Sequence, residues 1–259
     1  MDVAESSTAR IGAMLTTSIE PQRSGPPPLL RGLSDQERSE VVSVGARRIL
    51  YKGATLFSQG RPQNGIYLIE SGRIKVFYAA PSGRAITLAY WHPGNFVGGP
   101  EVFDHGVHVW SGVAAVNSSV LHLPGQELRK MVARMPKLGV NIIEGLAFKG
   151  KCYSGMAQML GTRSATERLA YVLLQLMDLY GVHEDEGVLI AANFTHADIS
   201  NMIGATRQWV TINLQRFAEQ GILNSRRSHL VIQDPTALFA IRDGLEGKGA
   251  TEQTASAQE

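Results

Sequence analysis

The stretch "THADISNMIGATRQWVTINLQRF", residues 195–217, decides the fold of the C-terminal part of the chain. Its pattern predicts two short helices joined by a tight turn at Gly204, because apolar residues recur at helical spacing on either side of that glycine. The apolar faces consist of Ile199, Met202 and Ile203 in the first helix and of Val210, Leu214 and Phe217 in the second. Polar residues occupy the opposite face of the second helix. We therefore expect a helical hairpin whose polar face is either ordinary solvated surface or the contact with a partner.

That polar face carries residue types that read DNA bases. Arg207, Gln208 and Thr211 lie on it, and at the start of a recognition helix Arg can bond guanine and Gln can bond adenine through paired hydrogen bonds. The next stretch, "GILNSRRSHLVIQD" (221–234), predicts a small hairpin with Arg226 and Arg227 at its tip, where arginine can contact phosphate. Together these parts predict a winged helix-turn-helix that binds DNA.

Composition narrows the function classes further. At 259 residues the chain can form two compact domains, and its net charge of +2 requires a DNA-binding surface to concentrate basic residues locally or to be doubled in a dimer. The single cysteine, Cys152, excludes an intramolecular disulfide framework and argues against a multi-cysteine zinc or iron–sulfur site. No apolar run approaches the roughly 18–20 residues of a membrane span. The acidic start, Asp2 and Glu5, does not suit a signal peptide, so we expect a cytoplasmic protein without membrane contact.

Ahead of the helical hairpin, the chain divides into an arm, a β-rich region and a long helix. Residues 1–27 and 244–259 have low complexity, which predicts a flexible arm and a disordered tail. Residues 28–130 begin with a capping box at Ser34 and Glu37 and continue as short apolar runs separated by Gly and Pro, which predicts a β-sandwich or barrel.

Residues 131–161 predict a helix with a narrow stripe of small and apolar residues. The stripe has alternating spacings of four and three, which is the pattern of a coiled-coil seam between two chains; the alternative is a helix packed on its own β domain. Its members are Gly139, Ile143, Leu146, Gly150, Tyr153, Ala157 and Leu160. A second capping box at Ser164 and Glu167 begins a new domain, so the break at 161–163 is a plausible hinge.

The order of these parts resembles the Crp/Fnr family of bacterial transcription regulators. The stretches that carry the resemblance are "GIYLIESGRIKVF" (65–77), "PGNFVG" (93–98) and "IGATRQWVTINLQRF" (203–217). The resemblance implies an α+β chain with a β-roll sensor of the cupin-like, cyclic-nucleotide-binding type (28–130), a dimerisation helix (131–161) and a winged helix-turn-helix (162–243). It also implies a homodimer on a pseudo-palindromic double-stranded DNA site, contact with RNA polymerase, base reading by Arg207, Gln208 and Thr211, and phosphate contact near Thr206. Gln208 stands where family members commonly have Glu, so the half-site should differ from the usual one.

The same resemblance predicts an effector pocket in the sensor, but the two residues that bind cyclic AMP in other members are replaced here. In members that bind cyclic AMP, a Glu holds the ribose and an Arg neutralises the phosphate; Gly99 and Val109 stand at these positions here, with Trp110 beside them. A phosphate buried against valine would lack a counter-ion, which is costly. We therefore expect an apolar or aromatic effector rather than a cyclic nucleotide, in a pocket formed by Gly99, Val109, Trp110 and Tyr153.

Three alternatives stay open at this point. The chain could bind DNA constitutively and be regulated by its abundance, or it could sense a gas through haem, with axial ligands among His92, His105, His108 and His122. It could also be a regulatory module that docks on another protein. No metal site is predicted, because His105 and His108 lack a third ligand. No nucleophile elbow, phosphate loop or zinc-protease helix is present in the sequence, so an enzyme is not expected.

Overall fold

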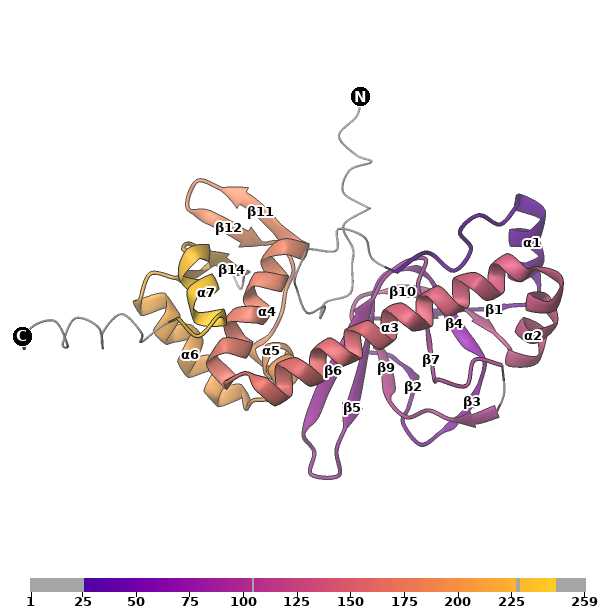
Figure 1. The fold of residues 1–259 in the computed structure, drawn as a ribbon, viewed down its shortest axis with the longest axis horizontal. Helices are drawn as coiled ribbons and strands as arrows, with labels where there is room; N and C mark the ends of the chain where they lie inside the picture. Colours follow the sequence, from indigo (N-terminus) through magenta and orange to yellow (C-terminus); the bar gives the residue numbers. More distant parts are fainter. Residues whose placement is uncertain (1–25, 104, 227–228, 246–259) are drawn as a thin grey trace, which may run out of the picture. The chain divides into compact units, whose positions relative to one another are not determined.

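The computed structural model describes residues 26–103, 105–226 and 229–245. The chain divides into two compact units between Met156 and Ala157 (Figure 1). The predicted arm (1–27) and tail (244–259) lie outside the described residues except at their inner ends.

The N-terminal unit is a roll of antiparallel strands. It begins with helix α1 (Asp35–Ser43), whose Ser34–Glu37 capping box is present as predicted. Two four-stranded sheets follow, with strand orders β1-β10-β4-β7 and β2-β9-β5-β6, beside a ribbon of β3 and β8. The strands are β1 (Ala46–Leu50), β2 (Thr55–Phe57), β3 (Pro62–Asn64), β4 (Ile66–Ser71), β5 (Ile74–Ala79), β6 (Ala85–Trp91), β7 (Phe96–Gly98), β8 (His105–Val107), β9 (Ser111–Ala114) and β10 (Ser118–Leu123).

Glycine is required where these strands turn most tightly. Gly65, between β3 and β4, has φ +79°, and a Cβ there would lie 2.0 Å from the carbonyl oxygen of Leu123. Only glycine adopts this conformation readily and leaves room for the neighbouring backbone. The predicted pattern of short strands punctuated by Gly and Pro is therefore confirmed as a β-roll.

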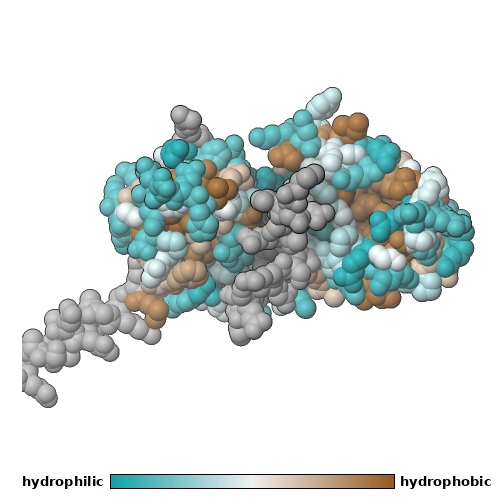
Figure 2. All heavy atoms as spheres, turned by 90° about the horizontal axis from the view of Figure 1, so that it is seen from above, coloured by the Kyte–Doolittle hydropathy of each residue, from teal (hydrophilic) through white to brown (hydrophobic). Residues whose placement is uncertain are grey.

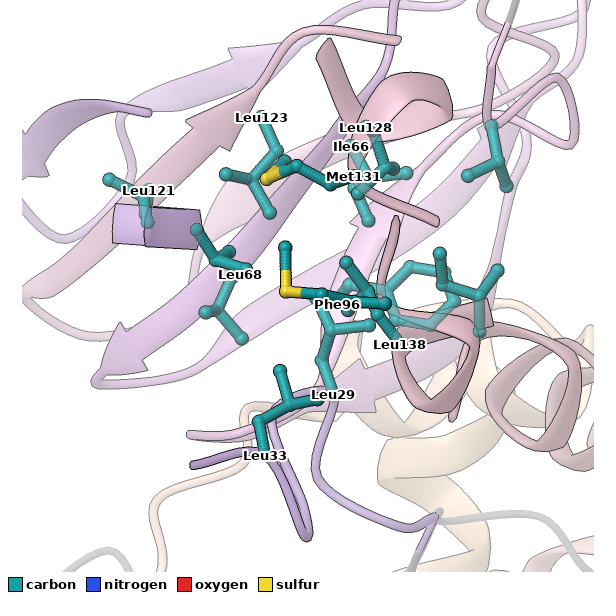
Figure 3. Packing of buried hydrophobic residues seen from close by; sticks show 14 residues of the cluster. Leu29, Leu33, Ile66, Leu68, Phe96, Leu121, Leu123, Leu128, Met131 and Leu138 are labelled. Atoms are coloured by element: carbon teal, nitrogen blue, oxygen red, sulfur yellow. The ribbon is translucent and has the colours of Figure 1, made fainter. Parts of the chain in front are cut away.

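One core cluster joins the roll to two helices, α2 (Gly125–Arg134) and α3 (Pro136–Thr162). Figure 3 shows Leu128 and Met131 of α2 and Leu138 of α3 packed with side chains of β4, β7 and β10. The boundary expected at 130/131 is therefore wrong, because it would cut through α2. The long helix starts at Pro136, after Met135 leaves helical geometry (φ −122°, ψ 77°), and proline suits the first position of a helix.

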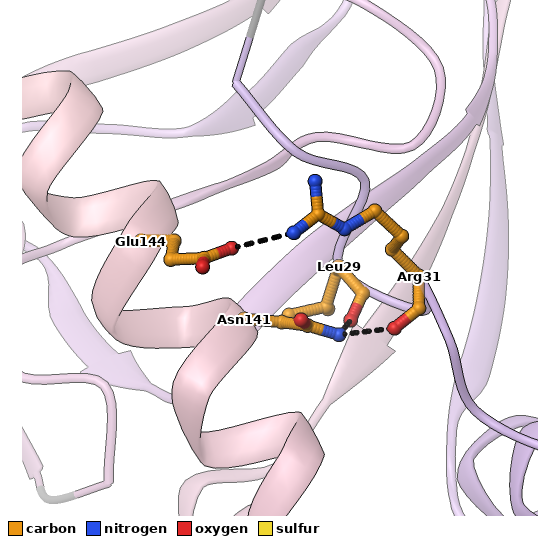
Figure 4. A network of polar contacts seen from close by, with 4 residues as sticks. All are labelled: Leu29, Arg31, Asn141 and Glu144. Carbon is orange, nitrogen blue, oxygen red and sulfur yellow. Dashed lines mark hydrogen bonds and ion pairs between the residues drawn. The ribbon is translucent and has the colours of Figure 1, made fainter.

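Polar contacts fix which face of α3 packs on its own unit. The buried Asn141 donates from Nδ2 to the carbonyl oxygens of Leu29 and Arg31, both at 2.8 Å, and Arg31 pairs with Glu144 at 3.2 Å (Figure 4). This orientation buries Leu138, Ile142, Cys152 and Met156.

The opposite face of α3 carries an exposed stripe that differs in register from the predicted seam. We call it the α3 stripe; its members are Val140, Ile143, Ala147, Gly150, Ser154 and Ala157. Ile143, Gly150 and Ala157 belong to both patterns. Of the other predicted seam residues, Tyr153 packs with Trp110 of its own unit, Leu146 is 36% exposed, and Leu160 is half-buried. Two stripes of small residues run along one helix, and packing within the unit covers Tyr153 of the predicted seam. The pairing of this helix with a second chain stays a prediction.

The C-terminal unit combines a helical core with a four-stranded sheet. Helix α4 (Ala165–Tyr180) starts at the predicted Ser164–Glu167 capping box. The sheet order is β11-β12-β14-β13, so the predicted two-stranded wing is half of a larger sheet. The remaining elements are β11 (Gly181–Glu184), β12 (Gly187–Ile190), α5 (His196–Ile203), α6 (Arg207–Glu219), β13 (Leu223–Arg226), β14 (His229–Ile232) and α7 (Pro235–Arg242).

Within the described residues, no helix combines the length and apolar character needed to cross a membrane. On the face drawn in Figure 2, hydrophobic residues are scattered among hydrophilic ones.

Candidate functional site

The α5–α6 hairpin is built by local sequence signals. Gly204 ends α5 in the left-handed conformation, with φ +67°. Two residues later, Thr206 caps α6, and its hydroxyl accepts a hydrogen bond from the Trp209 N–H at 3.2 Å. The apolar residues predicted for each helix, from Ile199 to Phe217, are all buried. These signals fix where α6 begins and which face it presents to solvent.

The start of α6 presents an exposed polar surface. Arg207 and Gln208 are its first two residues, and both are exposed. Within the described part of the chain, neither side chain forms a hydrogen bond or an ion pair. The first backbone N–H groups of a helix also point outward and favour anions such as phosphate. Arg207 and Gln208 are thus free to bond a partner, beside a helix end that attracts its phosphates.

Thr211 has a role in packing that the sequence did not indicate. Its hydroxyl lies 2.8 Å from His196 Nδ1 and donates to the Arg207 carbonyl oxygen at 3.0 Å. A hydroxyl has only one proton to donate. The Thr211 hydroxyl therefore connects the beginnings of α5 and α6. Its methyl group takes no part in these hydrogen bonds.

The wing carries its arginine in an ion pair. Arg226, the last residue of β13, lies 3.1 Å from the carboxylate of Glu184 in β11, and both side chains are partly exposed. Arg227, also predicted to bind DNA, lies outside the described residues. A phosphate bound at Arg226 would have to compete with Glu184, which lies 42 residues away in sequence.

The N-terminal unit contains a cavity of about 230 Å³. Of the predicted pocket residues, Gly99, Trp110 and Tyr153 line it. Val109 does not; it is 42% exposed, because the adjacent Trp110 turns inward and places its ring against Tyr153 at 5.7 Å. The full lining is Val76, Trp91, Phe96, Val97, Gly98, Gly99, Pro100, Trp110, Leu146, Lys149, Gly150 and Tyr153.

Lys149 gives this otherwise apolar cavity a cationic group. Its ammonium donates to the Phe96 carbonyl oxygen at 2.6 Å and lies 4.0 Å from the ring centres of both Trp91 and Phe96. Burial lowers the pKa of Lys149 to about 7, opposed by the nearby Cys152 thiol. The sequence contained a usable signal for this residue, since Lys149 continues the spacing of the buried residues Ile142, Gly145 and Cys152.

The cavity lacks one of the two groups that the resemblance expects for a cyclic nucleotide. None of its lining residues carries a carboxylate for a ribose. At the position expected to hold one, a Cβ on Gly99 would lie 1.5 Å from the Gln63 amide oxygen, so the buried Gln63 fills that space. Gln63 is held by a hydrogen bond from its Nε2 to the Glu101 carbonyl oxygen at 2.7 Å.

None of the described histidines is among the residues that line the cavity. His92 is buried, and this burial, with the positive charge of Arg73, lowers its pKa to about 4. His108 stacks on Phe57 with ring centres 4.4 Å apart, and burial lowers its pKa. The candidate haem ligands therefore do not line this cavity.

Two family models match the chain: the cyclic nucleotide-binding domain over residues 47–135 and the Crp-like helix-turn-helix domain over residues 167–241. The cyclic AMP receptor protein of Thermus thermophilus is 26% identical over 84% of this chain and 98% of its own length. A CRP-like cAMP-activated global transcriptional regulator of Mycobacterium tuberculosis is 27% identical over 72% of this chain and 84% of its own length.

Solved structures share the fold at lower identity. A mutant of CooA from Carboxydothermus hydrogenoformans superposes with a TM-score of 0.69 at 23% identity, covering 88% of this chain and 98% of that one. The c-di-GMP-responsive global regulator CLP of Xanthomonas campestris has a TM-score of 0.71 at 16% identity, covering 77% and 99%. These likenesses establish the arrangement of a β-roll followed by helices and a helix-turn-helix.

Proposed function

Because the chain belongs to the Crp/Fnr family of transcription regulators, we propose that it is a cytoplasmic homodimer that binds specific DNA sequences and is gated by an effector other than a cyclic nucleotide. Members of this family are transcription regulators and not enzymes, in agreement with the sequence analysis. The observation that carries the DNA-reading part is the exposed, unbonded pair Arg207–Gln208 at the capped start of α6. Thr206 and the wing arginines would contact phosphate, and RNA polymerase would be the protein partner.

The α3 stripe supports the dimer. Val140 is 44% and Ile143 67% exposed, although both are apolar residues in the first third of a long helix. A narrow stripe of this kind suits a second, identical helix. A dimer would present two α6 helices to half-sites about one helical turn apart, as a pseudo-palindromic site requires.

Selection of DNA from a random duplex pool by the full-length protein tests the DNA-reading proposal. Wild type should enrich a two-fold symmetric site, whereas a protein-docking module would enrich none. Arg207→Ala should weaken binding by about 1–3 kcal/mol and relax the preference at one base pair. Arg226→Ala should weaken all sequences alike, since phosphate contacts carry no sequence information. Equal, sequence-independent losses in both variants would refute the assignment of α6 as the reader.

Calorimetry with cyclic AMP and cyclic GMP at millimolar concentration tests the effector class. We expect no binding heat and no change in DNA affinity, because the cavity lacks a ribose-binding carboxylate. Cyclic-nucleotide binding that tightens the DNA complex would refute the proposal. DNA affinity that no small molecule alters would instead favour constitutive binding regulated by abundance.

A further inference from the structure

The charge of Lys149 is not balanced by the protein around it. Its ammonium has three protons to donate, and the bonded acceptor is a single carbonyl oxygen, that of Phe96. No carboxylate pairs with Lys149 within residues 26–103, 105–226 and 229–245. The ring faces of Trp91 and Phe96 attract a cation, but they do not neutralise it. A buried charge without a counter-ion is costly, so an anion that enters the cavity would be strongly favoured at this point.

The other lining residues indicate that the uncharged part of this anion is apolar. Apart from Lys149, the side chains are aliphatic or aromatic, and the indole N–H of Trp110 is already bonded to the Gly98 carbonyl oxygen at 2.7 Å. The volume of about 230 Å³ is below the roughly 300–1,000 Å³ of pockets that hold drug-sized ligands. The cavity therefore has room for one apolar ring with one charged group.

We propose that this cavity binds a small aromatic carboxylate, with the Lys149 ammonium as its counter-ion and the aromatic side chains packed against its ring. The inference rests on the proposed function, since it names the chemical class of the effector for the same site.

The position of the cavity on α3 provides a route to gating. Leu146, Gly150 and Tyr153 contribute three successive turns of α3 to the lining, and Gly150 also belongs to the α3 stripe. A ring packed against Gly150 would contact the same turn that faces the partner helix in the proposed dimer. Ligand binding would then favour one packing of the helix pair over another, which is the differential contact that a switch requires.

Binding should also depend on pH. Lys149 must be protonated to pair with the acid, and its pKa is about 7. The titratable groups that face it come from α3 itself: burial raises the pKa of Cys152 to about 12 and raises the pKa of Tyr153 above its ordinary range. Strands β6 and β7 contribute Trp91 and Phe96, which do not titrate. A carboxylic acid stays ionised above about pH 6, so above that pH only Lys149 changes its charge. Affinity should therefore fall about tenfold per pH unit above 7, as Lys149 loses its proton.

The test uses the full-length protein with benzoate, phenylacetate and their neutral amides, benzamide and phenylacetamide. Binding is followed by calorimetry and by tryptophan fluorescence, since Trp91 and Trp110 line the cavity. At about pH 6.5 at least one acid should bind roughly tenfold or more tightly than its amide, because a charged hydrogen bond is lost in the amide. Lys149→Met should abolish this preference. Lys151→Met, on the exposed side of the same helix, is the matched control and should retain it.

Three results would overturn the proposal: no acid binds at millimolar concentration, the amides bind as tightly as the acids, or Lys149→Met binds the acids like wild type. DNA selection with dialysed protein, in the absence of any acid, separates this inference from the proposed function. A selected DNA site together with failed acid binding defeats the effector class alone. Acid binding without any DNA preference defeats the proposed regulator alone.

Discussion

Replacing Lys149 by methionine should change how the stability of the protein depends on pH. Burial lowers the pKa of Lys149 from 10.5 to about 7 in the folded chain. Between about pH 7 and 10.5 the unfolded chain therefore binds a proton at this lysine that the folded chain does not, so stability rises with pH. One proton contributes a slope of about 1.4 kcal/mol per pH unit within that window. Because Lys149 is partly exposed, the pKa shift, and with it the width of the window, should be smaller than for a fully enclosed lysine.

Methionine has no proton to bind, so the variant should be more stable than wild type at about pH 6.5, and this difference should narrow as the pH approaches 9.5. Urea unfolding of both full-length proteins at several pH values measures the difference. Tryptophan fluorescence is a suitable signal, because Trp91 and Trp110 belong to the N-terminal unit. Lys151→Met should follow wild type at every pH. A stability difference between wild type and Lys149→Met that stays constant from pH 6.5 to about 9.5 would refute the burial of this charge.

Three further substitutions test other parts of the structure. Ile143→Glu should split the dimer at micromolar concentration, because a charge in an apolar helix pair cannot be solvated. Sedimentation should show no such effect for Ile49→Glu, which replaces a similarly exposed apolar residue on β1. An intact Ile143→Glu dimer would exclude the α3 stripe as the interface. Glu184→Gln should tighten binding to all DNA sequences by about 0.5–1 kcal/mol and steepen its salt dependence, because Arg226 loses its competing carboxylate. Unchanged affinity in a filter-binding titration would contradict this. Thr206→Ala should destabilise the C-terminal unit by about 0.5–2 kcal/mol through loss of the α6 cap, and urea unfolding at wild-type stability would show that the cap is dispensable.

Features that depend on neighbouring residues could be predicted from the sequence. The capping boxes at Ser34 and Ser164 and the glycine turn at Gly204 involve residues within a few positions of each other, and all three are present. The buried faces of α5 and α6 follow from helical periodicity, and the order of sensor, long helix and helix-turn-helix follows from the family resemblance.

Features that depend on distant residues could not be predicted in the same way. Glu184 reaches Arg226 across 42 positions, and β11 and β12 extend a sheet of which only the wing had been expected. Which stripe of α3 is exposed is decided by Asn141, whose partners lie more than 100 residues away at Leu29 and Arg31. The cavity cation continues the spacing of the buried residues Ile142 and Gly145, but lysine is ordinarily solvated, so this signal alone does not predict burial. The approach of α3 to Phe96 at Gly145 encloses Lys149.

The packing of Gln63 against Gly99 restricts how this cavity can change during evolution. A side chain at position 99 requires that the end of the Gln63 side chain move away or that Gln63 be replaced by something smaller, because the two would otherwise occupy the same space. Either change removes the hydrogen bond to the Glu101 carbonyl oxygen, which weakens the local fold. A carboxylate at position 99 is therefore coupled to the side chain at position 63, although Gln63 itself does not line the cavity.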